Sequence, residues 1–508
     1  MQTPIPIIDI FAGPGGLGEG FSASKSEHGK PIFKIKLSIE KDEFAHRTLE
    51  LRAFFRQFGG NQVPSGYYEY LKGKISKEAL FTKYPKEAAQ AQNETWLAEL
   101  GVTSNDLIDT RIRAALNGSS NWILIGGPPC QAYSLVGRSR MRGVNKDKYE
   151  QDPRHFLYKE YLRILAIHQP PVFVMENVKG LLSAKVKQQN TFDLILADLQ
   201  DPILATQNKS RHTLSYKLFS ISKKRDGTLG ETKPEDFIVH SEDYGIPQAR
   251  HRIIILGIRS DVYQSDPATL KKIEQVFIED VIGDLPKLRS GLSKEEDSAK
   301  EWKNAVKSIT NANWLQSIDL QGEIISALTK VGASLSRGAA YIPSPFVPKK
   351  HKDWYIDNTL SGVCNHETRG HIRKDLHRYF FAAIFARVNG RSPTLNDFPK
   401  ALLPNHENVE EAINGSKFND RFRVQVRGKP STTVVSHISK DGHYYIHYDP
   451  SQCRSLTVRE AARLQTFPDN YFFEGNRTQQ YHQVGNAVPP LLAIKIAEVV
   501  YDVLNKSK

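Results

Sequence analysis

The chain has 508 residues, more than one hydrophobic core usually organises, which predicts two or three domains. Its 69 lysines and arginines outnumber 56 aspartates and glutamates, and the net charge of +13 favours a polyanionic partner such as nucleic acid. Three cysteines exclude a disulfide framework and indicate a reducing compartment. No apolar run approaches the roughly 18 residues of a membrane span, so we expect a cytoplasmic protein that has no membrane partner.

Short apolar runs in the first third of the chain alternate with segments of helical periodicity. The runs Ile5–Ile10, Ile35–Ile39, Trp122–Ile125 and Val172–Met175 are rich in β-branched residues. Such runs are typical of strands that are buried on both faces of a parallel sheet. The alternation predicts an α/β protein with a doubly wound sheet.

Further strands are expected later in the chain. Tyr216–Ser220 and Ile253–Ile258 are short apolar runs, and Arg421–Val426 and Tyr444–Tyr448 alternate polar with apolar residues. The stretch 45–120 is longer than one crossover connection needs, so we interpret it as a helical insertion.

Composition divides the chain into three parts. Residues 260–453 are polar, rich in turns and scattered with basic and aromatic side chains, whereas 492–503 has the apolar face of a helix. We therefore predict a larger domain formed by 1–259 together with 454–508, and a separate, smaller domain over 260–453.

A glycine-rich turn, Asp9–Gly18, follows the first predicted strand. Glycines there let the backbone approach a ligand and lead into a helix whose N-terminus favours an anionic group. Glu40 ends the second strand, where an acidic side chain can accept hydrogen bonds from ribose hydroxyls. Considered separately, the glycine-rich segment could be a plain tight turn, and Glu40 could be a solvated surface carboxylate.

A stiff turn carries a cysteine directly after the strand Trp122–Ile125. Pro128 and Pro129 precede Cys130 at the end of the strand where α/β proteins bind ligands. A thiolate on a rigid turn is a candidate nucleophile, although an isolated cysteine is more often a small buried side chain.

Two further groups of polar residues stand at strand ends. Glu176 closes the strand Val172–Met175 and should share a sheet edge with Cys130, as a proton donor would. Gln248, Arg250 and Arg252 alternate, which places them on one face of a strand. Two guanidiniums can clamp a base carbonyl or a phosphate, and a surface ion-pair ladder is the alternative.

Taken in order, these motifs resemble the C5-cytosine DNA methyltransferase family of bacterial restriction–modification systems. The matching pieces are Asp9–Gly18, Glu40, Gly127–Gln131, Glu176–Val178, Gln248–Arg252, Arg454–Pro468 and Gln483–Pro490. The resemblance implies a Rossmann-like sheet, S-adenosylmethionine as methyl donor, double-stranded DNA as partner and a target-recognition domain over 260–453. It also implies a monomer without an obligate protein partner, beside a restriction endonuclease that it does not contact.

The resemblance assigns roles to particular residues. Cys130 would attack C6 of a flipped cytosine, Glu176 would act at N3, Arg252 would hold O2 and Arg250 would support the site. Residues Gln131 to Arg140 would form a loop that closes over the base. The implied cofactor-binding residues are Phe11, Ala12, Gly13, Gly15, Gly16, Leu17, Glu40, Pro128, Leu157, Asn486 and Val488.

The chain departs from the family pattern near the expected adenine. Lys41 stands where the family often carries a bulky apolar residue. No acidic residue is an evident partner for the adenine amino group, and Asp106 and Asp109 are the candidates.

Three other functions would leave different features in the sequence. A related tRNA methyltransferase would carry Cys-Phe-Thr in the recognition region, whereas Cys364 is followed by Asn365. A non-enzymatic relative should have lost Cys130, Glu176 or Arg252. A nicotinamide-dependent oxidoreductase would leave the cysteine turn unexplained.

A metal site is not expected. Cys364, His366, His371 and His377 match no common zinc spacing, and arginines are interleaved with them. We interpret this segment as a polar, DNA-facing loop and helix.

Overall fold

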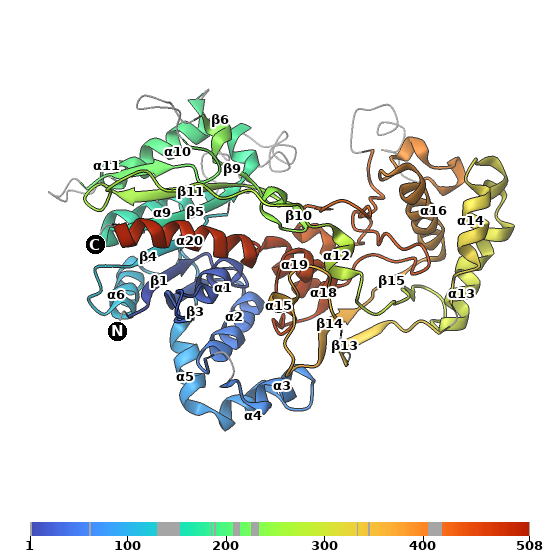
Figure 1. Ribbon diagram of the computed structural model, residues 1–508, viewed down its shortest axis with the longest axis horizontal. Coiled ribbons are helices and arrows are strands. Elements are labelled where there is room, and N and C mark those ends of the chain that lie inside the picture. The colour runs from blue at the N-terminus through green and yellow to red at the C-terminus, as the bar shows by residue number, and fades with distance from the viewer. Residues whose placement is uncertain are drawn as a thin grey trace.

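The structure is a computed structural model, shown in Figure 1. It describes residues 3–59, 62–129, 153–183, 185–186, 189–206, 214–224, 233–332, 334–343, 346–404 and 419–506. Within these ranges, no helix combines the length and the apolar character that crossing a membrane requires.

A mostly parallel sheet forms the centre of the larger lobe in Figure 1, with strand order β3-β2-β1-β4-β5-β11-β8 and β9 beside β11. The strands are β1 (Ile5–Ile10), β2 (Phe33–Glu40), β3 (Thr95–Leu97), β4 (Ile123–Gly126), β5 (Val172–Val178), β8 (Tyr216–Phe219), β9 (Ile238–His240) and β11 (His251–Arg259). Neighbours from β3 to β5 run parallel, whereas β11 is antiparallel to β5, β8 and β9. The α/β fold class predicted from the sequence is confirmed.

Helices cover both faces of this sheet. Helices α1 (Gly16–Ala23) and α20 (Pro490–Lys506) pack on one face, and α6 (Asn105–Leu116), α9 (Pro153–His168) and α10 (Thr191–Gln200) pack on the other. Side chains of one strand alternate between the two cores, as Ile123 and Ile125 do against Leu124. The last helix of the chain thus lies against the first, as Figure 1 shows.

A helical lobe follows β2. It comprises α2 (Glu43–Arg56), α3 (Ser65–Leu71), α4 (Lys77–Lys83) and α5 (Pro85–Glu94), and its core includes Phe54, Tyr67 and Leu80. The helical insertion expected over 45–120 is shorter than predicted. Its last part belongs to the sheet domain, because β3 extends the sheet and α6 covers one face of it. A strand of three residues is too short to produce a recognisable alternation.

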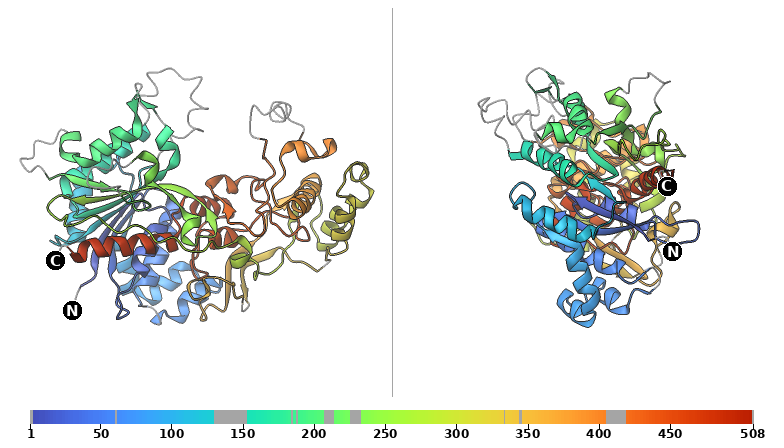
Figure 2. Two further views of the ribbon diagram at one scale, coloured as in Figure 1. Left: turned by 45° about the horizontal axis from the view of Figure 1, so that its top comes forward. Right: turned by 90° about the vertical axis from the view of Figure 1, so that its left-hand side faces the viewer.

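The second lobe is built from the middle of the chain. Its elements are α12 (Ile278–Ile282), α13 (Ala299–Lys307), α14 (Gln321–Leu328), β13 (Gly338–Pro343), α15 (Lys352–Tyr355), β14 (Gly362–Glu367) and α16 (Arg373–Asn389). Helices α13, α14 and α16 lie to the right in Figure 1 and in the left view of Figure 2, whereas α12, α15 and β14 lie nearer the centre and share a core with residues 458–487. Trp302, Tyr379 and Phe380 are central to its core. Short elements elsewhere are β6 (Lys185–Val186), β7 (Gln189–Asn190), α11 (Pro202–Ala205), β10 (Gln248–Ala249), β12 (Gly291–Leu292), β15 (Gly370–His371) and β16 (Ser431–Thr432).

Strands were expected at Arg421–Val426 and Tyr444–Tyr448, and that expectation is wrong. The two segments are joined by a single bridge between Val424 and Ile446. The buried side chains of these segments pack into the core around α16 instead of facing a sheet, and this packing produces the same alternation.

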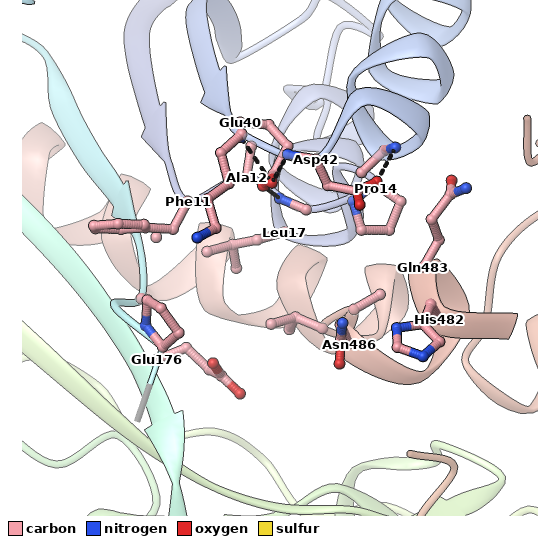
Figure 3. Close-up of a pocket in the computed structure, with 18 of the residues that line it drawn as sticks. Phe11, Ala12, Pro14, Leu17, Glu40, Asp42, Glu176, His482, Gln483 and Asn486 are labelled. Atoms are coloured by element: carbon pink, nitrogen blue, oxygen red, sulfur yellow. Dashed lines mark hydrogen bonds between the residues drawn. The ribbon is translucent and has the colours of Figure 1, made fainter. Parts of the chain in front are cut away.

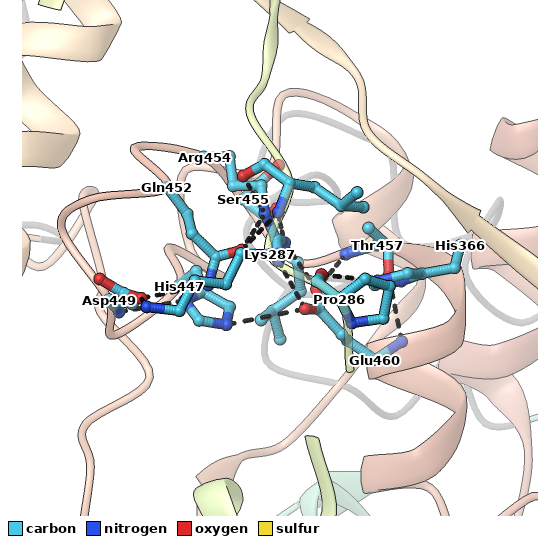
Figure 4. A network of polar contacts seen from close by, with 12 residues as sticks. Pro286, Lys287, His366, His447, Asp449, Gln452, Arg454, Ser455, Thr457 and Glu460 are labelled. Atoms are coloured by element: carbon cyan, nitrogen blue, oxygen red, sulfur yellow. Dashed lines mark hydrogen bonds and ion pairs between the residues drawn. The ribbon is translucent and has the colours of Figure 1, made fainter. Parts of the chain in front are cut away.

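A buried polar network joins the second lobe to α18 (Val458–Leu464), as Figure 4 shows. The carboxylate of Glu460 accepts hydrogen bonds from both terminal nitrogens of Arg454, each at 2.7 Å, and from the Thr457 amide at 2.7 Å. His366 lies 2.8 Å from the Thr457 hydroxyl, and His447 lies 3.6 Å from Glu460. The positive charge of Arg454 holds the pKa of Glu460 well below its usual range despite burial.

This network predicts a loss of stability in acid. Burial lowers the pKa of His366 and of His447 to about 4, from an ordinary value of 6.5. Between these values the unfolded histidines take up protons that the folded ones do not, so stability falls as the pH falls. We expect the free energy of unfolding, measured in urea, to decrease by on the order of 2–4 kcal/mol between about pH 7 and pH 5. A His366→Gln variant should show a weaker dependence, and an equal dependence in both proteins would contradict this assignment.

Candidate active site

A cavity of about 700 Å³ opens at the carboxyl ends of the parallel strands, and Figure 3 shows its lining side chains around an open centre. The segments that follow β1, β2 and β4 reach it, together with the last three residues of β5, Glu176–Val178. Because β11 is antiparallel, it begins at the same edge, where Arg252 and the preceding Arg250 join the wall. Helix α19 (Arg477–Asn486) closes the remaining side. A cavity of this size can hold a nucleotide-like ligand.

Glu40 ties the glycine-rich loop to the end of β2. Its carboxylate accepts hydrogen bonds from the amide of Gly13 at 2.7 Å, and from the amides of Lys41 and Asp42 at 2.9 and 2.8 Å. Burial raises the pKa of Glu40 while these amides act in the opposite direction. The side chain is thus fixed on the cavity wall, as Figure 3 shows.

Two glycines of the predicted cofactor set do not line the cavity. Gly15 and Gly16 lie behind the wall, where a Cβ on Gly16 would come within 2.2 Å of the Val488 carbonyl oxygen. Gly16 therefore allows the segment after α19 to pack on the start of α1. The other predicted cofactor residues line the cavity: Phe11, Ala12, Gly13, Leu17, Glu40, Pro128, Leu157, Asn486 and Val488.

Asp9, within β1, was not predicted as a site residue. Its side chain is 1% exposed, it lies on the cavity wall, and neither carboxyl oxygen has a hydrogen-bond partner among the described residues. Burial raises the pKa of Asp9 to about 8. An uncompensated buried carboxyl is costly, so this position fits a ligand that brings a positive charge.

Glu176 and Arg252 form an ion pair at the cavity, with Arg252 Nε 2.9 Å from Glu176 Oε1. Arg252 also donates to the His251 carbonyl at 2.9 Å, and its burial lowers its pKa. The pairing follows from the register, because Ile254 lies opposite Glu176 and Arg252 opposite Val178. The two side chains are therefore held side by side where a bound base could meet both.

Arg250 has a different environment from Arg252. It is buried and donates to the Val434 carbonyl at 2.8 Å and to the Gly485 carbonyl at 3.3 Å. Gln248 accepts from the Val434 amide at 2.7 Å. Burial, with Arg252 nearby, lowers the pKa of Arg250 well below its usual range. Arg250 thus joins β11, the segment at 434 and α19, and it positions the site.

The proline turn lies against the end of β5. A Cβ on Gly127 would come within 2.1 Å of the Glu176 carbonyl oxygen, so only glycine allows this approach. The Asn177 side-chain amide donates to the Pro128 carbonyl at 3.4 Å. Cys130 and the loop Gln131–Arg140 lie outside the described residues, but Pro129, directly before Cys130, lines the cavity.

Asp106 and Asp109 do not line the cavity. Asp109 accepts hydrogen bonds from Arg163, on α9, and lies 2.8 Å from His168. Both candidates sit on α6, whereas Ala98 and Leu100, between β3 and α6, form this part of the wall. Lys41 pairs with Glu99 at 2.9 Å.

Several lining residues gave no signal in the sequence. Val435 and Ser436 come from the segment after β16, and Thr478, Gln479 and His482 come from α19. The block Gln483–Pro490 directly follows these three residues of α19 in the chain, but it did not single them out.

The cysteine and histidines at 364–377 are not gathered into one site. Cys364 and His371 are buried, and His371 lies 3.3 Å from the Ser455 hydroxyl. His366 belongs to the network around Glu460, and His377 lies 3.0 Å from Ser308. The expectation of a DNA-facing loop is therefore wrong for Cys364, His366 and His371, whose side chains lie in the interior.

A doubly wound sheet with a cavity at its carboxyl edge is typical of α/β proteins that bind nucleotide-like ligands there. Residues 74–202 and 235–502 match the protein family described as C-5 cytosine-specific DNA methylase. Type II methyltransferase M.Bpa9945I of Bacillus paralicheniformis is 34% identical over 520 residues, which cover 98% of this chain and 99% of that protein. DNA (cytosine-5-)-methyltransferase M.ApeKI of Aeropyrum pernix is 28% identical, with 77% and 83% covered.

The fold is also similar to that of a solved structure. A protein from an E. coli prophage, described as a DNA modification methyltransferase, is 18% identical over 99% of both chains, with a TM-score of 0.52. The chain belongs to the C-5 cytosine-specific DNA methylase family and is a DNA cytosine-5 methyltransferase. Membership in this family excludes the oxidoreductase alternative.

Proposed function

We propose that this enzyme methylates C5 of a cytosine flipped out of double-stranded DNA, through a covalent bond between Cys130 and C6. The observation that supports the proposal most is that one cavity gathers Glu176, Arg252 and the residue before Cys130 beside the glycine-rich loop. The relatives are named Type II methyltransferases, so we further propose that it protects host DNA from a cognate restriction endonuclease.

The cavity fits S-adenosylmethionine. That cofactor, when bound, supplies the methyl group. Phe11 and Leu17 offer apolar surface for its adenine, Glu40 offers carboxylate oxygens for its ribose, and the partnerless carboxyl of Asp9 accepts positive charge.

Each side chain at the site has a separate role in the reaction. Cys130 forms a bond to C6, which increases the electron density at C5, while Glu176 stabilises N3 and Arg252 holds O2. After C5 has gained its methyl group, loss of the C5 proton restores the ring double bond and expels the Cys130 thiolate. Arg250 holds the start of β11 against α19 through its hydrogen bonds and does not take part in the reaction.

Incubation of the purified full chain with S-adenosylmethionine and bacterial genomic DNA tests the proposal. Sequencing that distinguishes 5-methylcytosine should show methylation at one short recurring sequence. Methylated adenine, or no methylation on any DNA, would overturn the proposal.

Glu40→Gln should weaken S-adenosylmethionine binding about tenfold to a hundredfold, because a buried ribose hydroxyl would lose its charged acceptor. Calorimetric titration measures the affinity, and the rate at saturating cofactor should change little. Glu43→Gln, in the exposed first turn of α2, is the matched control. Equal affinities of the two variants would contradict this role of Glu40.

We propose that target recognition resides in the predicted domain over 260–453, within 290–430. Residues 431–439 retain the parent sequence in the exchange described next. Val434 forms hydrogen bonds with Gln248 and Arg250, and Thr433 donates one to the Ala249 carbonyl. Exchanging 290–430 with the matching region of a relative of different specificity should transfer that specificity, as read by methylation sequencing. An active chimera that methylates the original sequence would place recognition elsewhere.

A further inference from the structure

A cluster of metal-ligating side chains lies on the side of β11 away from the cavity. His251, at the start of β11, pairs in register with His240, at the end of β9. The 3-10 turn η4 (Ser241–Tyr244) follows β9 and brings Glu242 beside both rings. Arg250 and Arg252 line the cavity, so the intervening His251 points to the opposite face.

The donor atoms of this cluster are close together. Glu242 Oε1 lies 2.7 Å from His251 Nε2 and 4.0 Å from His240 Nδ1, and the ring centroids are 4.1 Å apart. In the part of the chain that the structure describes, this is the one group of at least three such residues with all donor atoms within 4.8 Å of one another.

The second observation concerns the other carboxylate oxygen. Glu242 Oε2 is buried and has no hydrogen-bond partner within the described ranges. A buried carboxylate oxygen without a donor costs free energy, which a cation would remove. The Glu242 side chain is 14% exposed and that of His240 is 48% exposed, so an ion and a water molecule can enter from one side.

We propose that His240, Glu242 and His251 bind a divalent transition-metal ion, with Zn²⁺ as the best match and water as the fourth ligand. Two imidazole nitrogens and a carboxylate oxygen are donors that Zn²⁺ uses, at about 2.0–2.2 Å. The half-exposed His240 ring can turn to complete this geometry.

The ion acts on the catalytic strand through the backbone. Ser241, between two of the ligands, donates from its amide and its hydroxyl to the Arg250 carbonyl, at 3.3 and 2.5 Å. A metal that fixes η4 therefore fixes the backbone from which Arg250 and Arg252 extend. The ion has a positioning role and does not contact the cavity.

The test is titration of Zn²⁺ into the full, tag-free chain after chelator treatment, without DNA or S-adenosylmethionine. Calorimetry should show that one equivalent of Zn²⁺ binds. Co²⁺ bound in its place should give the visible absorption bands of a four-coordinate site. His240→Gln, Glu242→Gln and His251→Gln should each weaken binding by about 10- to 100-fold or more. His28→Gln, at an exposed histidine outside the cluster, should bind as the parent does.

A second measurement is independent of affinity. Zn²⁺ should slow amide hydrogen exchange in peptides that cover 238–252 in the parent chain, and should not do so in His240→Gln. Because His240 is half-exposed, this substitution should leave the fold intact. Cys130→Ser is titrated in parallel, since thiolates also bind Zn²⁺. Zn²⁺ affinity unchanged by the three ligand substitutions, or no stoichiometric binding, would overturn the metal site and leave the proposed methyl transfer untouched.

Discussion

Replacing Cys130 with serine should abolish methyl transfer and leave binding to duplex DNA largely intact. A serine hydroxyl is far less ionised than a thiol near neutral pH, so the bond to C6 would not form at a useful rate. The decisive measurement uses DNA that contains 5-fluorocytosine at the target. The fluorine atom cannot leave as a proton does, so the parent enzyme should become covalently trapped and Cys130→Ser should not.

The structure supplies a matched control for this experiment. Cys364 and Cys453 are both buried, and burial raises the pKa of the Cys364 thiol to about 12 and that of the Cys453 thiol further still. Neither thiol is a competent nucleophile at neutral pH. Cys453→Ser, which keeps a donor for the Leu376 carbonyl, should therefore still be trapped. An adduct at Cys453 or Cys364, or none in the parent, would refute the assignment of Cys130.

Glu176→Gln should slow the methyl-transfer step by about 10²–10⁴ with cofactor affinity little changed. Glutamine keeps the shape of the side chain but can neither deliver a proton nor pair with Arg252, which lies 2.9 Å from Oε1. Single-turnover kinetics with saturating S-adenosylmethionine measures the step directly. Glu40→Gln should instead lower the affinity for S-adenosylmethionine and leave the methyl-transfer rate little changed. Comparing the two variants therefore distinguishes the role of Glu176 in the reaction from that of Glu40 in cofactor binding.

The double variant adds a test of cooperation. Glu176→Gln combined with Cys130→Ser should be no slower than Cys130→Ser alone, because residues that act as a unit are not additive. A near-normal single-turnover rate for Glu176→Gln would mean that the carboxylate only orients Arg252. Cys130 would remain the nucleophile in that case.

Much of the candidate site could be predicted because its residues stand at the ends of strands. A strand buried on both faces appears in the sequence as an unbroken apolar run, and the first polar residue after it marks the carboxyl edge of the sheet. Glu40, Glu176 and the proline turn all stand at such ends, and all three reach the cavity. The order of the motifs along the chain also indicates the family.

Other features were decided by contacts between distant segments. Arg250 and Arg252 alternate identically in the sequence, but Arg250 donates to carbonyls 184 and 235 residues away, whereas Arg252 pairs with Glu176 on the neighbouring strand β5. Asp9 is hidden inside an apolar run, and its lack of a partner appears only when its surroundings are assembled.

The fold class, the family and the strand ends that carry polar side chains can therefore be predicted from local periodicity and motif order. Tertiary structure decided which of those side chains face the cavity, which hold the scaffold together, and that His240 and Glu242 meet His251. The physical reason is that burial, electrostatic environment and ligand geometry arise from residues brought together across the chain, and local sequence does not encode their distances.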